Sequence, residues 1–294
     1  MVIHRGIEPS SAKTSLSPLP DAGKKEGERQ PVLELQVGSA LDPGIRRRQA
    51  PNEDSLSVVH GLIASTPSKL FTLMIVADGM GGQAHGQEAS RLAVKSLSKY
   101  IMASLRTEQQ EPRPFIPLLE EGVNHTNQII YQRNRQQGTR MGTTITVALV
   151  VDNTAYIAHV GDSRLYLYRK ADGLSQITRD HSLVAALVTA GAIQPEEVYT
   201  HPGRNIIYRS LGERASVEVD TSTLTLADGD ILLICSDGLW EMVRDRQIAR
   251  ILKVPAPDPF DIAQALIQAA LAAGGEDNVS VIVARVHRKG HYPV

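Results

Sequence analysis

Residues 71–82 constrain the fold of this chain more than any other stretch, because an apolar run ends there abruptly in a carboxylate. The run up to Ala77 is almost entirely apolar and contains β-branched residues, which predicts a buried strand. Asp78 follows directly, and three of the next four residues are glycines. A carboxylate at the end of a buried strand is costly unless a cation or a hydrogen-bond network compensates its charge. The stretch alone fits two interpretations: a turn in which Asp78 caps the next helix, or part of a cation site.

An acidic residue at a strand end recurs at four other places in the chain. Asp237 ends the apolar run that begins at residue 231, and Asp162 follows the run 155–160. Asp54 and Asp277 each lie where a predicted strand begins. Acidic residues so far apart in sequence would converge if their strands shared a sheet edge, and converging carboxylates repel one another unless cations lie among them. The pattern therefore predicts a metal site at one sheet edge.

The residue types at these positions indicate which metal the site would hold. Carboxylates and a backbone carbonyl are the hard oxygen ligands that Mg²⁺ and Mn²⁺ prefer, whereas His and Cys, the usual zinc ligands, are largely absent there. Asp78 is suited to bridge two ions, and Gly79 can offer its carbonyl because no side chain blocks the approach. Two such ions would lower the pKa of a bound water and neutralise a phosphoryl group during in-line displacement.

Composition and charge argue against several classes of function. A net charge of −1 over 294 residues gives no electrostatic case for binding nucleic acid or an anionic membrane. No apolar run approaches the ~20 residues of a membrane span, and the N-terminus lacks the apolar core of a signal peptide. The single cysteine, Cys235, lies in an apolar strand and cannot form an intrachain disulfide. We therefore expect a cytoplasmic protein with no membrane or nucleic-acid partner.

The chain is expected to contain one domain. Residues 1–32 are rich in Ser, Pro, Gly and Lys and nearly lack bulky apolar side chains, which predicts a disordered tail. The domain is expected over residues 33–288, followed by a short tail over 289–294. Within the domain, the irregular, proline-containing segment 173–216 predicts a surface excursion or a functional flap.

The order of the predicted elements indicates an α+β domain. Stripes of apolar residues at helical spacing predict two long helices over 83–106 and 116–130. Alternating apolar residues predict a hairpin of strands 144–151 and 155–160, which strand 165–168 continues as a meander. Two more helices and a closing strand are expected at 248–252, 260–272 and 278–286. Hairpin-connected strands without βαβ alternation favour mainly antiparallel sheets.

Seven short motifs follow one another along the chain. They are Asn52-Glu53-Asp54-Ser55, Val76-Ala77-Asp78-Gly79-Met80-Gly81-Gly82, Gly142-Thr143-Thr144, Val160-Gly161-Asp162-Ser163-Arg164, Thr178-Arg179-Asp180-His181-Ser182, Ser236-Asp237-Gly238-Leu239-Trp240 and Glu276-Asp277-Asn278. In this order and spacing, over residues 32–286, the chain resembles the bacterial branch of the metal-dependent (type 2C, PPM) protein serine/threonine phosphatases. Each motif is weak alone, but the series is specific.

This resemblance implies a four-layer α-β-β-α sandwich of two mainly antiparallel sheets flanked by helix pairs. Two to three divalent metal ions, Mn²⁺ or Mg²⁺, would lie at one end of the sandwich. By the resemblance, Asp162 shares a third, weaker metal position with Asp237, and Asp54 and Glu53 touch the metals directly or through water. The first two ions would be held by a bridging Asp78, the Gly79 carbonyl, Asp237 and Asp277.

Two positions depart from the family pattern. Relatives place a phosphate-binding Arg where this chain has Gln49, so we assign phosphate binding to the adjacent Arg48, with Arg46 and Arg47 as alternatives. Eukaryotic relatives carry a His, the proposed general acid, where this chain has Met80, and bacterial relatives commonly have Met there. Methionine cannot donate a proton, so protonation of the leaving group must come from water or another residue.

The resemblance implies hydrolysis of phosphoserine and phosphothreonine in proteins by direct attack of a metal-bridging water, with Asp78, Asp237 and Arg48 as the catalytic residues. The expected partners are phosphorylated protein substrates and a bacterial Ser/Thr kinase that the enzyme opposes, and we expect a monomer. An alternative is a weak or inactive phosphoprotein-binding scaffold of the same fold, which the presence of Asp78, Asp237 and Asp277 disfavours. A third hypothesis keeps the chemistry but takes an anti-sigma antagonist as substrate.

Four residues beside the acidic positions have simpler structural interpretations. His159 lies within an alternating strand and is expected to be structural, while His181 fits a loop-ordering role and a chemical role about equally. Arg164 is expected to form a plain salt bridge rather than to orient a metal ligand. Trp240 is expected to lie in the core.

Overall fold

The computed structural model describes residues 33–65, 67–82, 84–107, 114–254 and 258–288. The predicted tails, residues 1–32 and 289–294, lie outside the described residues. The described residues all belong to one unit of mutually contacting chain. Within these ranges, no helix combines the length and the apolar character that a membrane crossing requires.

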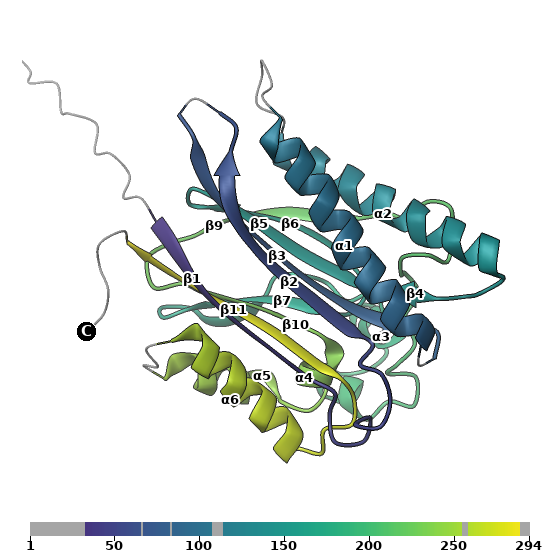
Figure 1. The fold of residues 1–294 in the computed structure, drawn as a ribbon. Helices are drawn as coiled ribbons and strands as arrows, with labels where there is room; N and C mark the ends of the chain where they lie inside the picture. Colours follow the sequence, from purple (N-terminus) through teal and green to yellow (C-terminus); the bar gives the residue numbers. More distant parts are fainter. Residues whose placement is uncertain (1–32, 66, 83, 108–113, 255–257, 289–294) are drawn as a thin grey trace, which may run out of the picture. The chain divides into compact units, whose positions relative to one another are not determined.

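Two antiparallel sheets form the centre of this unit (Figure 1). The first sheet has the strand order β1-β11-β10-β7-β8, and the second has the order β2-β3-β5-β6-β9, with the short β4 paired to the end of β3. The first sheet consists of β1 (Leu33–Asp42), β11 (Val279–Arg288), β10 (Ile231–Cys235), β7 (Arg164–Arg169) and β8 (Gly173–Gln176). The second consists of β2 (Asp54–Ile63), β3 (Lys69–Met80), β5 (Ile145–Val151), β6 (Thr154–Val160), β9 (Asp220–Thr225) and β4 (Gly142–Thr143).

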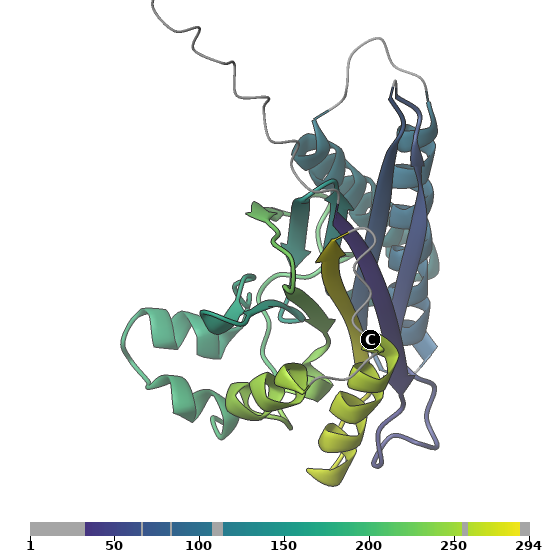
Figure 2. The ribbon, with the colours of Figure 1, turned by 90° about the vertical axis from the view of Figure 1, so that its left-hand side faces the viewer.

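Helices cover the outer face of each sheet, which gives four layers (Figure 1; Figure 2). The helices α1 (Ala84–Arg106) and α2 (Phe115–Gln137) pack on the second sheet, and α5 (Asp245–Lys253) and α6 (Pro259–Ala272) lie on the side of the first. Buried apolar clusters fill the three spaces: between α1–α2 and the second sheet, between the two sheets, and between the first sheet and α5–α6. The predicted α-β-β-α sandwich is confirmed.

Strand β5 shows why the two sheets stack. Ile145, Val147 and Leu149 belong to the cluster beneath α1 and α2, whereas Ala148 and Val150 belong to the cluster between the sheets. Successive side chains of a strand point to opposite faces, so a strand that is apolar on both must be covered on both. The predicted hairpin with β6 is present, and Asp152 in its turn adopts a φ of 55°.

The predicted meander is wrong at its third strand. Strand β7 does not pair with β6; it pairs with β10 and β8, in the other sheet. The chain crosses between the sheets at Gly161, whose φ of 113° favours glycine and where a Cβ would lie 2.5 Å from the side chain of Thr144. An alternating apolar pattern predicts a strand but not its partner, because partner choice depends on tertiary packing. The crossing matters because it places Asp162 between the two sheets.

The predicted flap begins as part of the first sheet. Its first four residues form β8, which pairs with β7. This segment also contains the helix α3 (Leu183–Thr189), and the Ser182 hydroxyl caps it by accepting from the backbone N–H of Ala185 at 3.3 Å. After α3 comes the 3₁₀ helix η1 (Pro195–Tyr199), and Figure 2 shows α3 and η1 extending away from the two sheets.

The packing of α1 on α2 gives a test of how tightly the helix layer over the second sheet is packed. Leu97 of α1 is fully buried. A Cβ added to Gly122 of α2 would lie only 2.9 Å from Cδ1 of Leu97, so the two helices pack closely there. Leu97→Ala is expected to lower the free energy of unfolding by about 2–5 kcal/mol, because it leaves a cavity in a close-packed contact. Urea denaturation measures the change. Leu62→Ala, at a side chain that is 59% exposed, should change it by less than about 0.5 kcal/mol; equal losses for the two variants would contradict this description of the core.

Candidate metal centre

The five predicted acidic residues lie at strand ends on both sheets. Asp54 is the first residue of β2 and is the direct register partner of Asp78 near the end of β3. Asp237 follows β10 as the first residue of the short helix α4 (Asp237–Trp240), and Asp277 lies just before β11. Asp162 lies in the crossing between β6 and β7. The sequence predicted one shared sheet edge, and this is wrong: four of the five lie at strand ends of two stacked sheets, and Asp162 lies in the crossing between them.

Direct hydrogen bonds join these two sets of strand ends. The Ser236 hydroxyl, beside Asp237, donates to Oδ2 of Asp54 at 2.7 Å. The side-chain oxygen of Asn278, beside Asp277, accepts from the backbone N–H of Glu53 at 2.8 Å. Residues separated by about 180 to 225 positions in sequence are thus in contact. Only sheet-on-sheet packing brings them together, which is why the pattern of strand ends could suggest the site but not its construction.

The backbone around Asp78 is held closely. The Asp78 N–H donates to the Thr144 hydroxyl at 2.9 Å, and its carbonyl accepts from the Thr144 N–H at 2.8 Å. At Gly79, a Cβ would lie 2.0 Å from the carbonyl oxygen of Gly86 and 2.7 Å from that of Glu53. No side chain fits there, so the glycine lets the turn after β3 pack against its neighbours.

The carboxylates lie close enough to raise one another's pKa. Loss of hydration raises the pKa of Asp78 well above its ordinary value, and the negative charges of Asp237, Asp54 and Asp162 add to the effect. Burial also raises the pKa of Asp237, and among the neighbouring charges that of Asp162 adds most to the effect. Burial raises the pKa of Asp54 to about 7, and burial with the Asp180 charge raises that of Asp162 to about 7. Several negative charges in one poorly hydrated place favour a bound cation.

One cation of the chain already contacts this cluster. The Arg47 guanidinium forms an ion pair with Oδ1 of Asp277 and a second, at 2.6 Å, with Oε2 of Glu53. Arg46 lies 3.5 Å from Glu276, while Arg48 is exposed. Of the three arginines, the structure therefore places Arg47 against the acidic side chains, and phosphate binding by Arg48 stays a prediction.

The donor atoms fit a hard divalent ion. Three buried carboxylate oxygens, Oε1 of Glu53, Oδ1 of Asp54 and Oδ1 of Asp237, have no hydrogen-bond partner. Buried charged oxygens without partners are costly, and oxygen-only ligand sets suit Mg²⁺ or Mn²⁺. In the described part of the chain, no three His, Cys, Asp or Glu side chains already stand close enough to enclose an ion. Asp277 contacts Arg47, and Asp54 accepts from the Ser236 hydroxyl.

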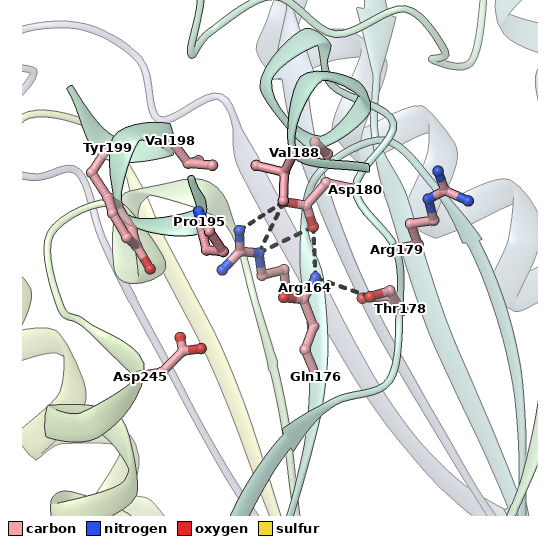
Figure 3. Close-up of a pocket in the computed structure, with 11 residues that line it drawn as sticks. Arg164, Gln176, Thr178, Arg179, Asp180, Val188, Pro195, Val198, Tyr199 and Asp245 are labelled. Atoms are coloured by element: carbon pink, nitrogen blue, oxygen red, sulfur yellow. Dashed lines mark hydrogen bonds and ion pairs between the residues drawn. The ribbon is translucent and has the colours of Figure 1, made fainter. Parts of the chain in front are cut away.

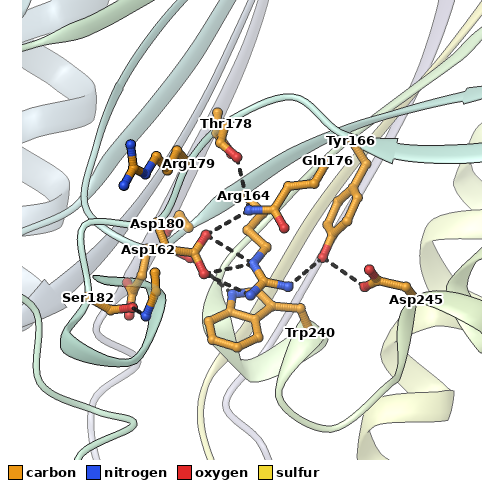
Figure 4. A network of polar contacts seen from close by, with 12 residues as sticks. Asp162, Arg164, Tyr166, Gln176, Thr178, Arg179, Asp180, Ser182, Trp240 and Asp245 are labelled. Carbon is orange, nitrogen blue, oxygen red and sulfur yellow. Dashed lines mark hydrogen bonds and ion pairs between the residues drawn. The ribbon is translucent and has the colours of Figure 1, made fainter. Parts of the chain in front are cut away.

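A buried network lies behind Asp162 (Figure 4). The Trp240 indole N–H donates to the carbonyl oxygen of Asp162 at 3.0 Å. The Arg164 guanidinium lies over the Trp240 ring, 3.6 Å from its centroid, and pairs with Asp180 at 2.7 Å. The expected salt bridge of Arg164 is present, but its contact with Trp240 also ties it to the acidic cluster. The sequence placed Trp240 only in the core, and no sequence signal links it to a residue 78 positions away.

The same arginine borders a surface pocket. Arg164 and Asp180 line a cavity of about 370 Å³ together with Tyr199 of η1 and Asp245 of α5 (Figure 3). The network behind Asp162 therefore reaches toward the segment predicted to be a flap.

Two histidines order the same region. His159 is buried, its pKa is lowered to about 3 by burial, and its ring contacts the Thr146 hydroxyl at 2.9 Å, which fits a structural role. Nδ1 of His181 accepts from the backbone N–H of Gly161 at 3.0 Å, and the backbone N–H of His181 donates to the Gly161 carbonyl at 2.7 Å. His181 therefore holds the turn that carries Asp162, which favours the loop-ordering interpretation.

Comparison with known proteins identifies the family. A family model described as "Protein phosphatase 2C" matches residues 43–271. The chain belongs to the protein phosphatase 2C family. This confirms the resemblance of the motifs. Phosphatase 2C relatives include protein phosphatase PhpP of Streptococcus pneumoniae, 38% identical over 220 residues that cover 74% of this chain and 87% of PhpP. Another is the serine/threonine phosphatase stp of Listeria monocytogenes, 38% identical over 216 residues, 72% of this chain and 83% of stp.

Solved structures of phosphatase 2C proteins share the fold. The Mycobacterium tuberculosis phosphatase PstP/Ppp superposes with a TM-score of 0.73 at 35% identity, covering 86% of this chain and 99% of that one. A Streptococcus agalactiae serine/threonine phosphatase gives 0.76 at 33% identity over the same shares. The PstP catalytic domain in complex with two manganese ions gives 0.71 at 35% identity, covering 87% and 99%. The family thus uses divalent metals, and the donor set described above suits them.

The raised pKa values predict how the ion-free protein responds to pH. Asp54 and Asp162 have folded pKa values near 7, whereas an unfolded Asp titrates near 3.9. The folded state therefore holds protons that the unfolded chain has released, so the free energy of unfolding should fall as pH rises through 7. We expect a lower urea midpoint at pH 8.5 than at pH 7 in excess chelator. This window lies above the ordinary histidine pKa of ~6.5, so histidine titration contributes little.

Manganese should oppose this loss of stability at high pH. The ion stabilises the ionised carboxylates, and ligands that bind only the folded state raise its stability. At pH 8.5, Mn²⁺ should raise the urea midpoint more than at pH 7, and Asp162→Asn should flatten the pH dependence seen in chelator. A midpoint that stays constant or rises between pH 7 and 8.5 without metal would contradict the assigned pKa directions.

Proposed function

We propose that this protein phosphatase 2C member is a metal-dependent enzyme that hydrolyses phosphoserine and phosphothreonine in proteins. The observation that carries the proposal is the convergence of Asp54, Asp78, Asp162 and Asp237 on one place, where the charges of Asp237, Asp54 and Asp162 add to burial in raising the pKa of Asp78. Such an arrangement is unfavourable without cations and serves to hold them. The names of the bacterial relatives, which are serine/threonine phosphatases, support the substrate class.

We propose two to three bound ions, Mn²⁺ or Mg²⁺. Asp78 is the shared ligand, because Asp237, Asp54, Asp162 and Asp277 all influence its charge. The remaining ligands are the Gly79 carbonyl, Asp237 and Asp277, with Asp162 and Asp237 at a third position and Asp54 as a direct or water-mediated contact. When bound, the ions supply positive charge against a phosphoryl group and lower the pKa of water. The complex of the PstP catalytic domain with two manganese ions supports the use of manganese.

The chain itself offers no cysteine nucleophile. Burial raises the pKa of Cys235 far above its ordinary value, and the thiol lies within β10 in the core between the first sheet and α5–α6. A thiol that stays protonated does not attack phosphorus. We therefore propose direct hydrolysis with no phosphoenzyme on this cysteine.

We propose that Arg47 contacts the substrate phosphate. Its guanidinium reaches Asp277 and Glu53 in the acidic cluster, whereas Arg48 faces solvent. A divalent ion at Asp277 would compete with Arg47 for that carboxylate, leaving the planar guanidinium available to two phosphate oxygens. Arg48 is retained as the alternative that the sequence first indicated.

The cellular setting is also a proposal. A protein that removes phosphate from serine and threonine opposes a Ser/Thr kinase, and we propose a cytoplasmic monomer acting on the substrates of such a kinase. An inactive phosphoprotein-binding scaffold is not favoured, since Asp78, Asp237 and Asp277 are all present at the site.

Hydrolysis of an aryl phosphate and of a phosphothreonine peptide tests the function. Wild type should turn over both substrates with Mn²⁺ and neither with excess chelator. Asp237→Asn should lower kcat by at least about 100-fold, because it removes a charged ligand that the transition state needs. The matched control is Asp261→Asn, at an exposed carboxylate in the first turn of α6, which should keep near-normal turnover. Chelator-insensitive turnover would refute the metal mechanism, and no turnover with any divalent ion would favour the scaffold.

The two arginine assignments give opposite results in one experiment. If Arg47 contacts phosphate, Arg47→Ala should raise KM for the aryl phosphate by about 10-fold or more, since a charge-assisted hydrogen bond contributes ~1.5–3 kcal/mol. Arg48→Ala should leave KM within about twofold. Steady-state kinetics at saturating Mn²⁺ measures both, and a reversed pattern would restore Arg48 to the role.

A further inference from the structure

Trp240 connects two of the carboxylates assigned to the metals. It is the last residue of α4, whose first residue is Asp237. Its indole N–H donates to the carbonyl oxygen of Asp162 at 3.0 Å, across to the turn between β6 and β7. One buried side chain therefore ties the short helix that carries Asp237 to the turn that carries Asp162.

The indole is fixed from the other side. Arg164 lies over the ring at 3.6 Å from its centroid, and three hydrogen bonds of 2.7–3.1 Å join its guanidinium to Asp180. A further bond of 2.8 Å runs from Arg164 to the Tyr166 hydroxyl, which donates to Asp245 at the start of α5. Trp240, Arg164 and Asp180 are all buried, so the indole has little freedom to turn (Figure 4).

The two carboxylates differ in how the rest of the fold supports them. Asp237 lies two residues after the end of β10, which has strands on both sides, β11 and β7. Asp162 lies in a turn that crosses between sheets, outside any strand pairing. His181 binds the backbone of the preceding Gly161 and Thr146 binds that of the following Ser163, whereas Trp240 binds the backbone of Asp162 itself. Two like charges this close repel and would move apart unless something restrains them. The bond from Trp240 supplies that restraint at the less supported of the two.

We propose that Trp240 is a positioning residue that fixes the separation of Asp162 and Asp237, and thereby sets the affinity of the metal position these two share. Arg164 and Asp180 act through Trp240 by holding its ring. The inference rests on the proposed function, in which Asp162 is a metal ligand. It predicts selectivity: ions held mainly by Asp78 and Asp277 should be affected little, because the indole N–H donates to Asp162.

Trp240→Phe tests the inference, because it keeps an aromatic ring beneath Arg164 and removes the N–H that binds Asp162. Mn²⁺ binding to the full chain is measured by calorimetry and by counting bound ions through manganese EPR. Asp162→Ala defines the Asp162-dependent ion as the one whose binding it abolishes. Trp240→Phe should lower the affinity for that ion by about 10- to 100-fold, as loss of a contact that supports a metal ligand typically does. The affinities for the remaining ions should change by less than about twofold.

A destabilised control separates positioning from general loss of structure. Ile267→Ala, in the buried face of α6, should lower the melting temperature without changing the affinity of any ion. Arg164→Lys keeps the positive charge but loses the bidentate pair with Asp180, and it should weaken the same ion as Trp240→Phe. If Trp240→Phe does not yield folded protein, Arg164→Lys carries the test.

The outcomes distinguish this inference from the proposed function. Unchanged affinity for the Asp162-dependent ion in folded Trp240→Phe, or in folded Arg164→Lys if that variant carries the test, overturns the positioning role. Equal weakening of every ion, matched by Ile267→Ala, overturns it as well. If Asp162→Ala loses no ion, the assignment of Asp162 as a metal ligand fails, while metal-dependent hydrolysis by the remaining ligands still stands.

Discussion

Mutual repulsion among carboxylates is the constraint on which the rest of this structure depends. Asp54, Asp78, Asp162 and Asp237 lie where hydration is poor, and burial raises the pKa of each, with neighbouring carboxylate charges adding to the effect. Folding therefore spends stability to bring them together, and the surrounding structure must hold them against repulsion. Strand pairing, close glycine packing and the Trp240 bond each do part of this. Stability is therefore lowered at this point, and the divalent ions proposed above would relieve the repulsion.

The two-sheet architecture explains how a site of this kind is built. Each sheet contributes acidic residues at corresponding strand ends, and the apolar cluster between the sheets fixes their relative position. Contacts such as Ser236 to Asp54 then lock the two ends together. The crossing at Gly161 adds Asp162 from a turn that belongs to neither sheet. A single sheet edge could not offer the same convergence from several directions.

Much of the fold and part of the site could be predicted from the sequence. Apolar periodicity gave α1, α2 and the β5–β6 hairpin, because local patterns record which face is covered. The acidic residues stood out because Asp after an apolar run is unusual. The partner of β7 was predicted wrongly, and Arg47 was named only as an alternative to Arg48. Both depend on packing between segments distant in sequence, which periodicity does not encode.

The sequence by itself determined which residues carry charge at strand ends, that their oxygens suit a hard divalent ion, and which family the chain resembles. These properties are local, since they follow from residue type and spacing. Only the tertiary structure decided that the acidic residues meet from two sheets and that Arg47 reaches them. It alone decided that Trp240 joins Asp162 to the helix of Asp237. The physical reason is that contacts across 78 or more positions arise from the packing of whole layers, and no short stretch of sequence specifies that packing.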